Sequence, residues 1–278
     1  MFLTGIADEA GESIEKQISA HKELGWNHIE IRNVNKKNLT DVDNTTFNRI
    51  TEKLEEAKMQ VSCFASQIAN WARKISGNFN IDMEELKRAI PRMHRLNTKF
   101  IRIMSYPNDN YSDEEWRKEV IRRLKELAKI AQDGGVILAH ENCSGWGGEN
   151  PEQALDIIES VKSPSLKFLL DTGNKPHKSG TVYELYQKIK SYVVYVHIKD
   201  FAGEKGDKFV FPGEGDAQVE KMIGEFISSG YNGGFSIEPH MASIIHLAKD
   251  ASDKDSAYRL YIEYGKRTQT LLENTMKR

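Results

Sequence analysis

Short runs of hydrophobic residues alternate along the chain with longer segments in which hydrophobic residues recur every three or four positions. The short runs have the length and composition of buried parallel strands, and the longer segments have one hydrophobic face, as amphipathic helices do. The predicted strands are Leu3–Ala7, His28–Arg32, Gln60–Ala65, Lys99–Ser105, Val136–Glu141, Lys167–Asp171, Tyr192–Asp200 and Phe235–Pro239. The predicted helices between them are Ser13–Leu24, Thr45–Ala57, Met83–Leu96, Asp113–Gln132, Pro151–Val161, Val182–Ile189 and Gln218–Ser229.

Residue types at the helix ends support these boundaries. Ser112 precedes a run of acids and Asn150 precedes a proline, so both positions suit a helix N-cap. Gly25 and Gly135 follow the last hydrophobic position of their helices, where glycine adopts the left-handed conformation that ends a helix.

The repeated strand–helix unit predicts the fold. Eight such units, without a linker rich in Gly, Pro or Ser, predict a closed (β/α)₈ TIM barrel that forms a single domain over residues 1–278. A doubly wound open sheet is the alternative, but it favours an early glycine-rich phosphate turn, which Ala7–Gly11 does not provide. The tail Ala251–Arg278 predicts an extra C-terminal helix that packs across the outside of the barrel or mediates dimerisation.

The composition excludes several functional classes. The chain has 278 residues, of which 39% are hydrophobic and 29% charged, enough for a large core and a solvated surface. A net charge of -2 and the lack of a basic stripe argue against nucleic-acid binding. No apolar run approaches the roughly 20 residues that span a membrane, so we expect no membrane association. Cys63 and Cys143 are the only cysteines, which favours the reducing cytoplasm.

Four strands in the second half of the chain end in a side chain that can bind a metal, namely Glu141, Asp171, His197 and Glu238. The carboxyl ends of barrel strands share one face, so we expect three carboxylates and one imidazole to meet there. Each residue alone could instead cap a helix or form an ion pair, but three clustered carboxylates without a cation would repel one another. The set predicts one divalent metal ion, with Mn²⁺ foremost and Mg²⁺, Co²⁺ or Zn²⁺ as alternatives.

Five short motifs surround these positions: His140–Asn142, Leu170–Asn174, Val196–Asp200, Pro212–Asp216 and Ser236–His240. They resemble the sugar phosphate isomerase/epimerase family of xylose isomerase-like TIM barrels, and the likeness covers nearly the whole chain. The resemblance implies the same four metal ligands. It also implies a small-molecule carbohydrate as the substrate.

The epimerases of that family use two metal-bound glutamates as an acid/base pair, which implies this role for Glu141 and Glu238. A Lewis acid that polarises a carbonyl makes the neighbouring hydrogen removable, and carboxylates on opposite faces can take the proton and return it. We therefore expect a metal-dependent sugar isomerase or epimerase that acts on a keto-sugar or polyol through an enediolate. A lyase or dehydratase of the same fold, in which the enediolate expels a substituent, is the nearest alternative.

One position departs from the family pattern. Ketose 3-epimerases carry a histidine three residues after the aspartate of the sixth strand, whereas this chain has Asn174 there and His177 farther along. An amide cannot shuttle protons, so a different sugar or a dehydratase reaction stays open. The segment His140–Gly148 also resembles barrels that eliminate aglycones from 3-oxo-glycosides.

Six further side chains are candidates for substrate contact. The two cations among them either bind substrate or neutralise the acidic mouth, and the two tryptophans either stack on a sugar ring or pack under a loop. For Glu30 and Arg32 on the second strand, we expect an internal ion pair. The predicted substrate-binding set is Asn174, His177, Lys199, Arg102, Trp71 and Trp146.

Two other functional classes fit less well. Endonuclease IV relatives cut DNA with several zinc ions and need more histidines at strand ends, while this chain has eight histidines in total. Its near-neutral charge also does not suit phosphate binding. A non-catalytic binding barrel usually lacks a metal ligand, and here all four are present. The sequence leaves open whether the chain forms a homo-oligomer.

Overall fold

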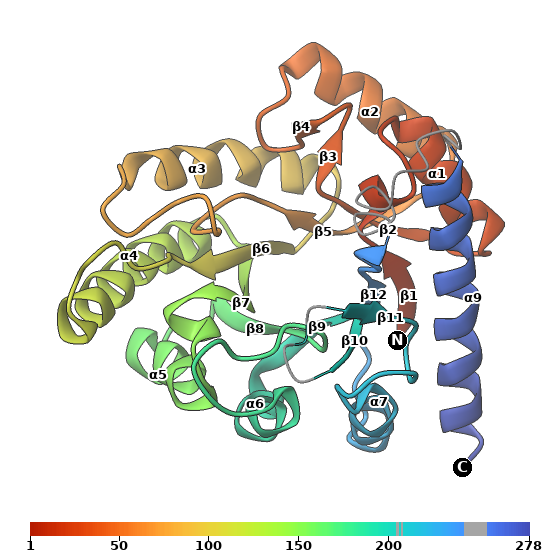
Figure 1. The fold of residues 1–278 in the computed structure, drawn as a ribbon. Helices are drawn as coiled ribbons and strands as arrows, with labels where there is room; N and C mark the ends of the chain where they lie inside the picture. Colours follow the sequence, from red (N-terminus) through yellow and green to blue (C-terminus); the bar gives the residue numbers. More distant parts are fainter. Residues whose placement is uncertain (204–205, 207, 242–254) are drawn as a thin grey trace.

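The strands form a barrel (Figure 1). The computed structural model of the protein describes residues 1–203, 206, 208–241 and 255–278. The barrel strands are β1 (Phe2–Gly5), β2 (His28–Ile31), β5 (Gln60–Ala65), β6 (Phe100–Ser105), β7 (Ile137–Gly145), β8 (Leu166–Asp171), β9 (Val193–Ile198) and β12 (Gly234–Ile237). They pair in the order β1-β12-β9-β8-β7-β6-β5-β2. A parallel bridge between Ile6, which follows β1, and Glu30 of β2 joins the first and last strands of this order and closes the barrel.

Helices cover the outside of this barrel (Figure 1). They are α1 (Ile14–Glu23), α2 (Asn44–Glu56), α3 (Asn80–Arg95), α4 (Asp113–Asp133), α5 (Pro151–Val161), α6 (Val182–Ile189), α7 (Val219–Ser228) and α9 (Ser256–Met276). Two antiparallel ribbons follow β2 and β9, namely β3 (Asn33–Val34) with β4 (Lys37–Asn38), and β10 (Asp200–Ala202) with β11 (Lys208–Val210). Every helix in the described part of the chain is too short or too polar to span a bilayer.

The predicted (β/α)₈ barrel with an extra C-terminal helix is confirmed. The differences are local: β7 continues beyond Glu141, and Asp200 opens β10 instead of closing β9. The β10–β11 ribbon has strands of only three residues, too short for a hydrophobic period to reveal. The Asp200 carboxylate ties the loop after β11 to the start of β10 by accepting hydrogen bonds from the backbone N–H groups of Gly213 and Gly215.

The helix ends form as their residue types predict. The Ser112 hydroxyl accepts a hydrogen bond from the backbone N–H of Glu115, and the Glu115 carboxylate accepts one from the backbone N–H of Ser112. α4 therefore begins with a capping box. The Asn150 side chain caps α5 by accepting a hydrogen bond from the backbone N–H of Gln153 at 2.9 Å. Gly135 follows α4 with φ +67°, the conformation that glycine adopts without steric cost.

β12 places apolar side chains outward and a polar side chain in the barrel interior, where other strands contribute hydrophobic residues such as Cys63, Ala139 and Leu169. On β12, Phe235 and Ile237 pack in the main hydrophobic core. Because side chains alternate across a strand, Ser236 faces the interior, where it is fully buried. Ser236 is in register with Thr4 of β1 and His197 of β9, so a polar layer crosses the barrel at this level.

The last helix lies along the outside of the barrel. α9 buries Tyr261, Tyr264 and Leu272, and it contacts α1 and α7 (Figure 1). The predicted helix in the tail therefore packs across the outside of the barrel. The first part of the predicted tail, residues 251–254, lies outside the described residues.

Candidate metal centre

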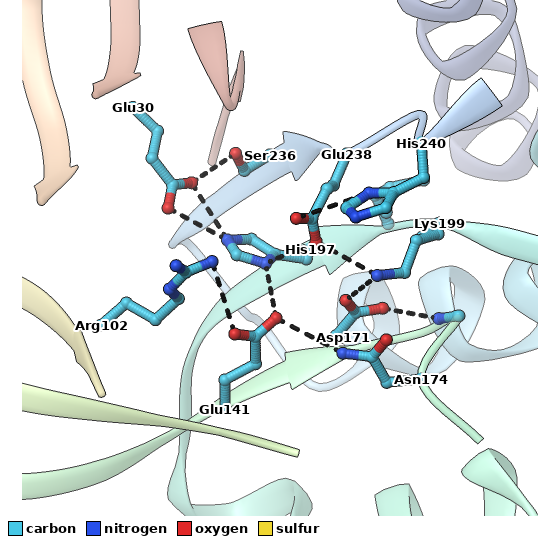
Figure 2. A network of polar contacts seen from close by, with 12 residues as sticks. Glu30, Arg102, Glu141, Asp171, Asn174, His197, Lys199, Ser236, Glu238 and His240 are labelled. Carbon is cyan, nitrogen blue, oxygen red and sulfur yellow. Dashed lines mark hydrogen bonds and ion pairs between the residues drawn. The ribbon is translucent and has the colours of Figure 1, made fainter. Parts of the chain in front are cut away.

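The four residues predicted as metal ligands meet at the mouth of the barrel (Figure 2). Glu141 lies within β7, Asp171 ends β8, His197 is the penultimate residue of β9, and Glu238 follows β12. One ligand atom of each residue lies within 4.8 Å of the ligand atoms of the other three. All four side chains are buried. They are called the metal-ligand cluster below.

His197 lies at the centre of the metal-ligand cluster. Its Nδ1 atom is 3.3 Å from Glu141 Oε1 and 3.4 Å from Glu238 Oε2. The Lys199 ammonium Nζ lies 2.7 Å from Asp171 Oδ2 and 3.2 Å from Glu238 Oε2. One imidazole and one ammonium group therefore lie directly among the three carboxylates.

The donor set and its spacing fit a divalent metal ion. Such ions bind carboxylate oxygen and imidazole nitrogen at about 2.0–2.2 Å, so opposite ligands lie roughly 4 Å apart. The 4.8 Å limit within the cluster is close to this separation. Among the described residues, Glu141 Oε2 has no hydrogen-bond partner and lies 3.5 Å from Arg102 Nη1, while Asp171 Oδ2 forms an ion pair with Lys199 Nζ at 2.7 Å. Each carboxylate oxygen has two lone pairs, so the cluster retains acceptor capacity beyond these ion pairs.

Charged neighbours keep the glutamate on β7 ionised. Burial alone would raise the pKa of Glu141, but the Arg102 guanidinium, 3.5 Å away, and the His197 ring lower that pKa to about 2. Burial would lower the pKa of His197, whereas the carboxylates of Glu30, Glu141 and Glu238 raise it well above its usual value. A divalent cation here would balance the carboxylates in place of the imidazolium and leave the imidazole neutral.

Hydrogen bonds from β7 and from the turn after β8 orient the aspartate at the end of β8. The Asn142 side chain accepts a hydrogen bond from the Asp171 backbone N–H at 2.8 Å and donates one to the Asp171 carbonyl at 2.9 Å. The Gly173 N–H donates to Asp171 Oδ1 at 2.7 Å. In the same turn, Asn174 Nδ2 donates to Glu141 Oε1 at 3.4 Å. The turn after β8 therefore positions two of the four ligands.

A cavity of about 350 Å³ opens above the metal-ligand cluster, with Glu141 and Glu238 among its lining residues. A larger hollow of about 590 Å³ lies at the other end of the strands, near Glu159, Lys162 and Tyr192. Within the described part of the chain, no set of metal ligands converges on that hollow. The cavity at the mouth is the stronger candidate for a binding site. Its polar and aromatic lining includes Asn33, Asn70, Trp71, Arg102, Asn174 and Lys199.

Comparison with known proteins agrees with this architecture. The model of the xylose isomerase-like TIM barrel family matches residues 18–260. The chain belongs to this family. An inosose dehydratase from Salmonella typhimurium is 26% identical over 145 residues, which are 46% of this chain and 48% of that protein. The chain thus spans about half the length of the curated relatives that it matches.

Two solved structures share the whole xylose isomerase-like barrel. One is described as the IOLI protein with a bound zinc atom; it is 18% identical, with a TM-score of 0.78 over 99% of both chains. The other, a D-tagatose 3-epimerase-like protein, is 17% identical, with a TM-score of 0.75 over 100% of this chain and 99% of its own. The predicted resemblance is confirmed at the level of the family. Because the named relatives are enzymes, the family membership supports the prediction that this protein is an enzyme.

Within this xylose isomerase-like barrel, two predicted substrate-binding residues lie away from the cavity. Trp146 is buried against Trp116, with ring centroids 5.2 Å apart, and its Nε1 donates to Asp156 Oδ2 at 3.1 Å. The exposed His177 lies with Nε2 2.9 Å from the Cys143 carbonyl oxygen, outside the cavity lining. The other four predicted residues, Asn174, Lys199, Arg102 and Trp71, line the cavity.

The expected ion pair between Glu30 and Arg32 does not form. Arg32 lies just beyond the end of β2, where its Nε is 3.0 Å from Asp8 Oδ1 and its Nη1 is 3.3 Å from Glu238 Oε1. Glu30 lies inside the barrel instead and contacts the ring of His197. The sequence signal for this contact was a carboxylate on the inward-facing side of a barrel strand.

Proposed function

We propose that this protein is a divalent-metal-dependent sugar isomerase or epimerase that acts on a small keto-sugar or polyol. The observation that carries the proposal is the position of Glu141 and Glu238 on two sides of His197, in the lining of one cavity (Figure 2). The cavity volume of about 350 Å³ suits a ligand of monosaccharide size. Mn²⁺ is the proposed ion.

The metal-ligand cluster would hold this ion. A divalent ion held there supplies a Lewis acid, which makes a hydrogen beside a substrate carbonyl acidic. Glu141 is ionised, and its Oε2 atom accepts that proton. Glu238 would take up a proton from solvent at Oε1, the oxygen that Arg32 orients from 3.3 Å, and donate it to the other face of the carbon, while Glu141 would release the abstracted proton to solvent. Proton removal and return on opposite faces inverts the carbon.

Four side chains of the cavity are proposed to bind the substrate. Lys199 and Arg102 are cations that would donate hydrogen bonds to substrate oxygens, and the Asn174 amide would fix a hydroxyl group. Trp71 keeps 69% of its surface exposed at the rim, which leaves its indole face available for stacking on a sugar ring.

A lyase or dehydratase reaction is the second candidate function. The partial match to inosose dehydratases favours it, as does the asparagine at position 174 where ketose 3-epimerases carry histidine. The first step would be the same removal of a proton beside a carbonyl. Loss of the substituent on the next carbon would then leave a carbon–carbon double bond conjugated to the carbonyl.

The test uses protein loaded with Mn²⁺ or, in parallel, Zn²⁺. The loaded protein is incubated in D₂O with ketoses, inososes and 3-oxo-glycosides. An isomerase or epimerase gives a new sugar by NMR with deuterium at the reacting carbon. A lyase gives a product with the near-ultraviolet absorbance of an unsaturated ketone. Metal-replete protein that produces neither deuterium exchange nor product from any of these compounds would contradict both functions.

A further inference from the structure

Glu30 occupies an unusual place for a carboxylate. Its side chain lies on β2 inside the barrel and is fully buried. Both of its oxygens are 3.1 Å from His197 Nε2, and Oε2 accepts a hydrogen bond from the Ser236 hydroxyl at 2.6 Å (Figure 2). Ser236 and His197 are register neighbours on β12 and β9, so the three side chains form one contact group.

No lysine or arginine forms an ion pair with Glu30 among the described residues, where its one ionic contact is with His197. Burying a carboxylate without a good partner destabilises the folded protein, because the charge loses its hydration. An uncharged side chain, as at nearby Tyr195 and Cys63, would fill the barrel interior without that cost. The contact with His197 is therefore the feature that explains a carboxylate at this position.

The contact also distinguishes the two nitrogens of the imidazole ring. With Nε2 facing Glu30, Nδ1 is left to face the carboxylates of Glu141 and Glu238 at 3.3 and 3.4 Å. A neutral imidazole carries one hydrogen, and the nitrogen without it offers a lone pair. A hydrogen bond from Nε2–H to a carboxylate leaves that lone pair on Nδ1, and it holds the ring in the plane that this lone pair needs to reach a metal.

We propose that Glu30 is a positioning residue that fixes His197 as the Nε2–H tautomer and thereby prepares Nδ1 to bind the metal. Ser236 holds the Glu30 carboxylate in place for this role. The inference rests on the proposed metal site and deepens it, because it assigns the ligand atom of His197 and the group that selects that atom.

The first experiment measures Mn²⁺ affinity by competition with a chelator for wild type and Glu30→Gln. Loss of a partner that orients a metal-bound histidine weakens binding by about 10–100-fold. Glu30→Asp, which keeps the charge, is expected to recover part of the affinity if its shorter side chain still reaches Nε2. The matched control is Glu85→Gln, because Glu85 is also fully buried but contacts Thr40 and Arg73 instead of the metal-ligand cluster. This control is expected to keep wild-type affinity.

The second experiment is ¹⁵N NMR of His197 in the wild-type protein loaded with Zn²⁺, which needs no variant to fold. The expected signals are a protonated Nε2 and a metal-bound Nδ1. A metal bound at Nε2, or wild-type affinity in folded Glu30→Gln, would overturn the assignment of Glu30. Wild-type protein that binds no Mn²⁺ or Zn²⁺ would overturn the proposed function instead, and with it this inference.

Discussion

Two clusters in this barrel bury carboxylates but give them different hydrogen-bond partners. One is the metal-ligand cluster, and the other, called the loop cluster, consists of Arg73, Asp82 and Glu85. The loop cluster joins the segment after β5 to α3. Arg73 pairs with both of its carboxylates. The backbone N–H of Ala69 donates to Asp82, and the backbone N–H of Gln67 donates to Glu85, each at 3.0 Å.

In the metal-ligand cluster, by contrast, Glu141 Oε2 lacks a hydrogen bond within the described residues, and the contact of Asp171 Oδ2 is an ion pair with Lys199 without a backbone N–H donor. They lie near the cations of Lys199 and Arg102 but retain acceptor capacity. A group of buried acids that only stabilises the fold is satisfied by the protein itself, whereas a group that binds an ion keeps acceptors for it. The comparison therefore separates buried acids that the protein itself satisfies from buried acids that keep the acceptors which the proposed metal site requires.

The largest effect is expected from Glu141→Gln and Glu238→Gln. An amide keeps the volume of the side chain but cannot accept the proton, so the chemical step should slow by about 10²–10⁴-fold in each variant. Single-turnover rates are measured on samples whose metal content is determined in parallel. Glu85→Gln is the control from the loop cluster and should keep its rate. Metal-replete variants with near wild-type turnover would leave these glutamates as ligands only.

The loop cluster should respond in stability and not in chemistry. Removing one partner of a fully buried ion pair costs about 3–5 kcal/mol, and because Arg73 is partly exposed we expect Arg73→Ala to lower the unfolding free energy by about 3 kcal/mol. Urea denaturation measures this loss, and metal affinity should stay unchanged. Arg95→Ala, which breaks an exposed pair with Glu55, should change stability little. A large loss of metal affinity in Arg73→Ala would erase the distinction between the clusters.

The next largest effect is a loss of stability at low pH, caused by His21, a fully buried histidine without a carboxylate partner in the described part of the chain. Burial lowers the pKa of His21 to about 4, and its neighbours are the Gln17 carbonyl and the Tyr261 hydroxyl. The unfolded chain binds this proton near pH 6.5, but the folded protein does not until about pH 4. The contribution of neutral His21 to the free energy of unfolding is therefore fully present above pH 6.5 and is lost as the pH falls toward 4. The loss between pH 6 and 4.5 is roughly 2 kcal/mol. Urea denaturation of wild type and His21→Gln at both pH values tests this, and equal losses would contradict it.

The smallest effect is expected at the rim of the cavity, on the segment that the loop cluster holds. Stacking of an indole on a sugar is worth roughly 1–1.5 kcal/mol, so Trp71→Ala should raise KM about tenfold and leave kcat and metal affinity near wild type. Trp146→Phe is the matched control, because this buried tryptophan should affect thermal stability and not KM. Steady-state kinetics that show the same KM for Trp71→Ala and wild type would remove Trp71 from the binding site.

The fold and the four candidate ligands were predictable because both depend on local patterns. Hydrophobic runs locate the strands, and the barrel places the carboxyl ends of parallel strands on one face. The convergence of Glu141, Asp171, His197 and Glu238 follows from these two facts. The role of each ligand in catalysis stays a prediction.

Contacts between distant segments could not be predicted in this way. Glu30 and Arg32 are two positions apart in the sequence, but β2 ends at Ile31. Glu30 therefore faces the barrel interior, while Arg32 lies beyond the strand and reaches Asp8. Trp146 follows β7 as a rim residue would, but its packing against Trp116 depends on where α4 lies. The β10–β11 ribbon depends on a carboxylate that binds backbone groups more than ten residues away.

The central claim, a single divalent ion held by the metal-ligand cluster, is tested most directly by metal stoichiometry. The protein is stripped with a chelator, reloaded with Mn²⁺, and analysed for bound metal per chain together with its melting temperature. We predict one ion per chain in wild type, none in Glu141→Gln/Asp171→Asn, and a melting temperature that rises with metal concentration only in wild type. Wild-type protein without bound metal, its carboxylates balanced by Lys199 and Arg102 alone, would contradict the claim. A double variant that keeps stoichiometric metal would contradict it as well.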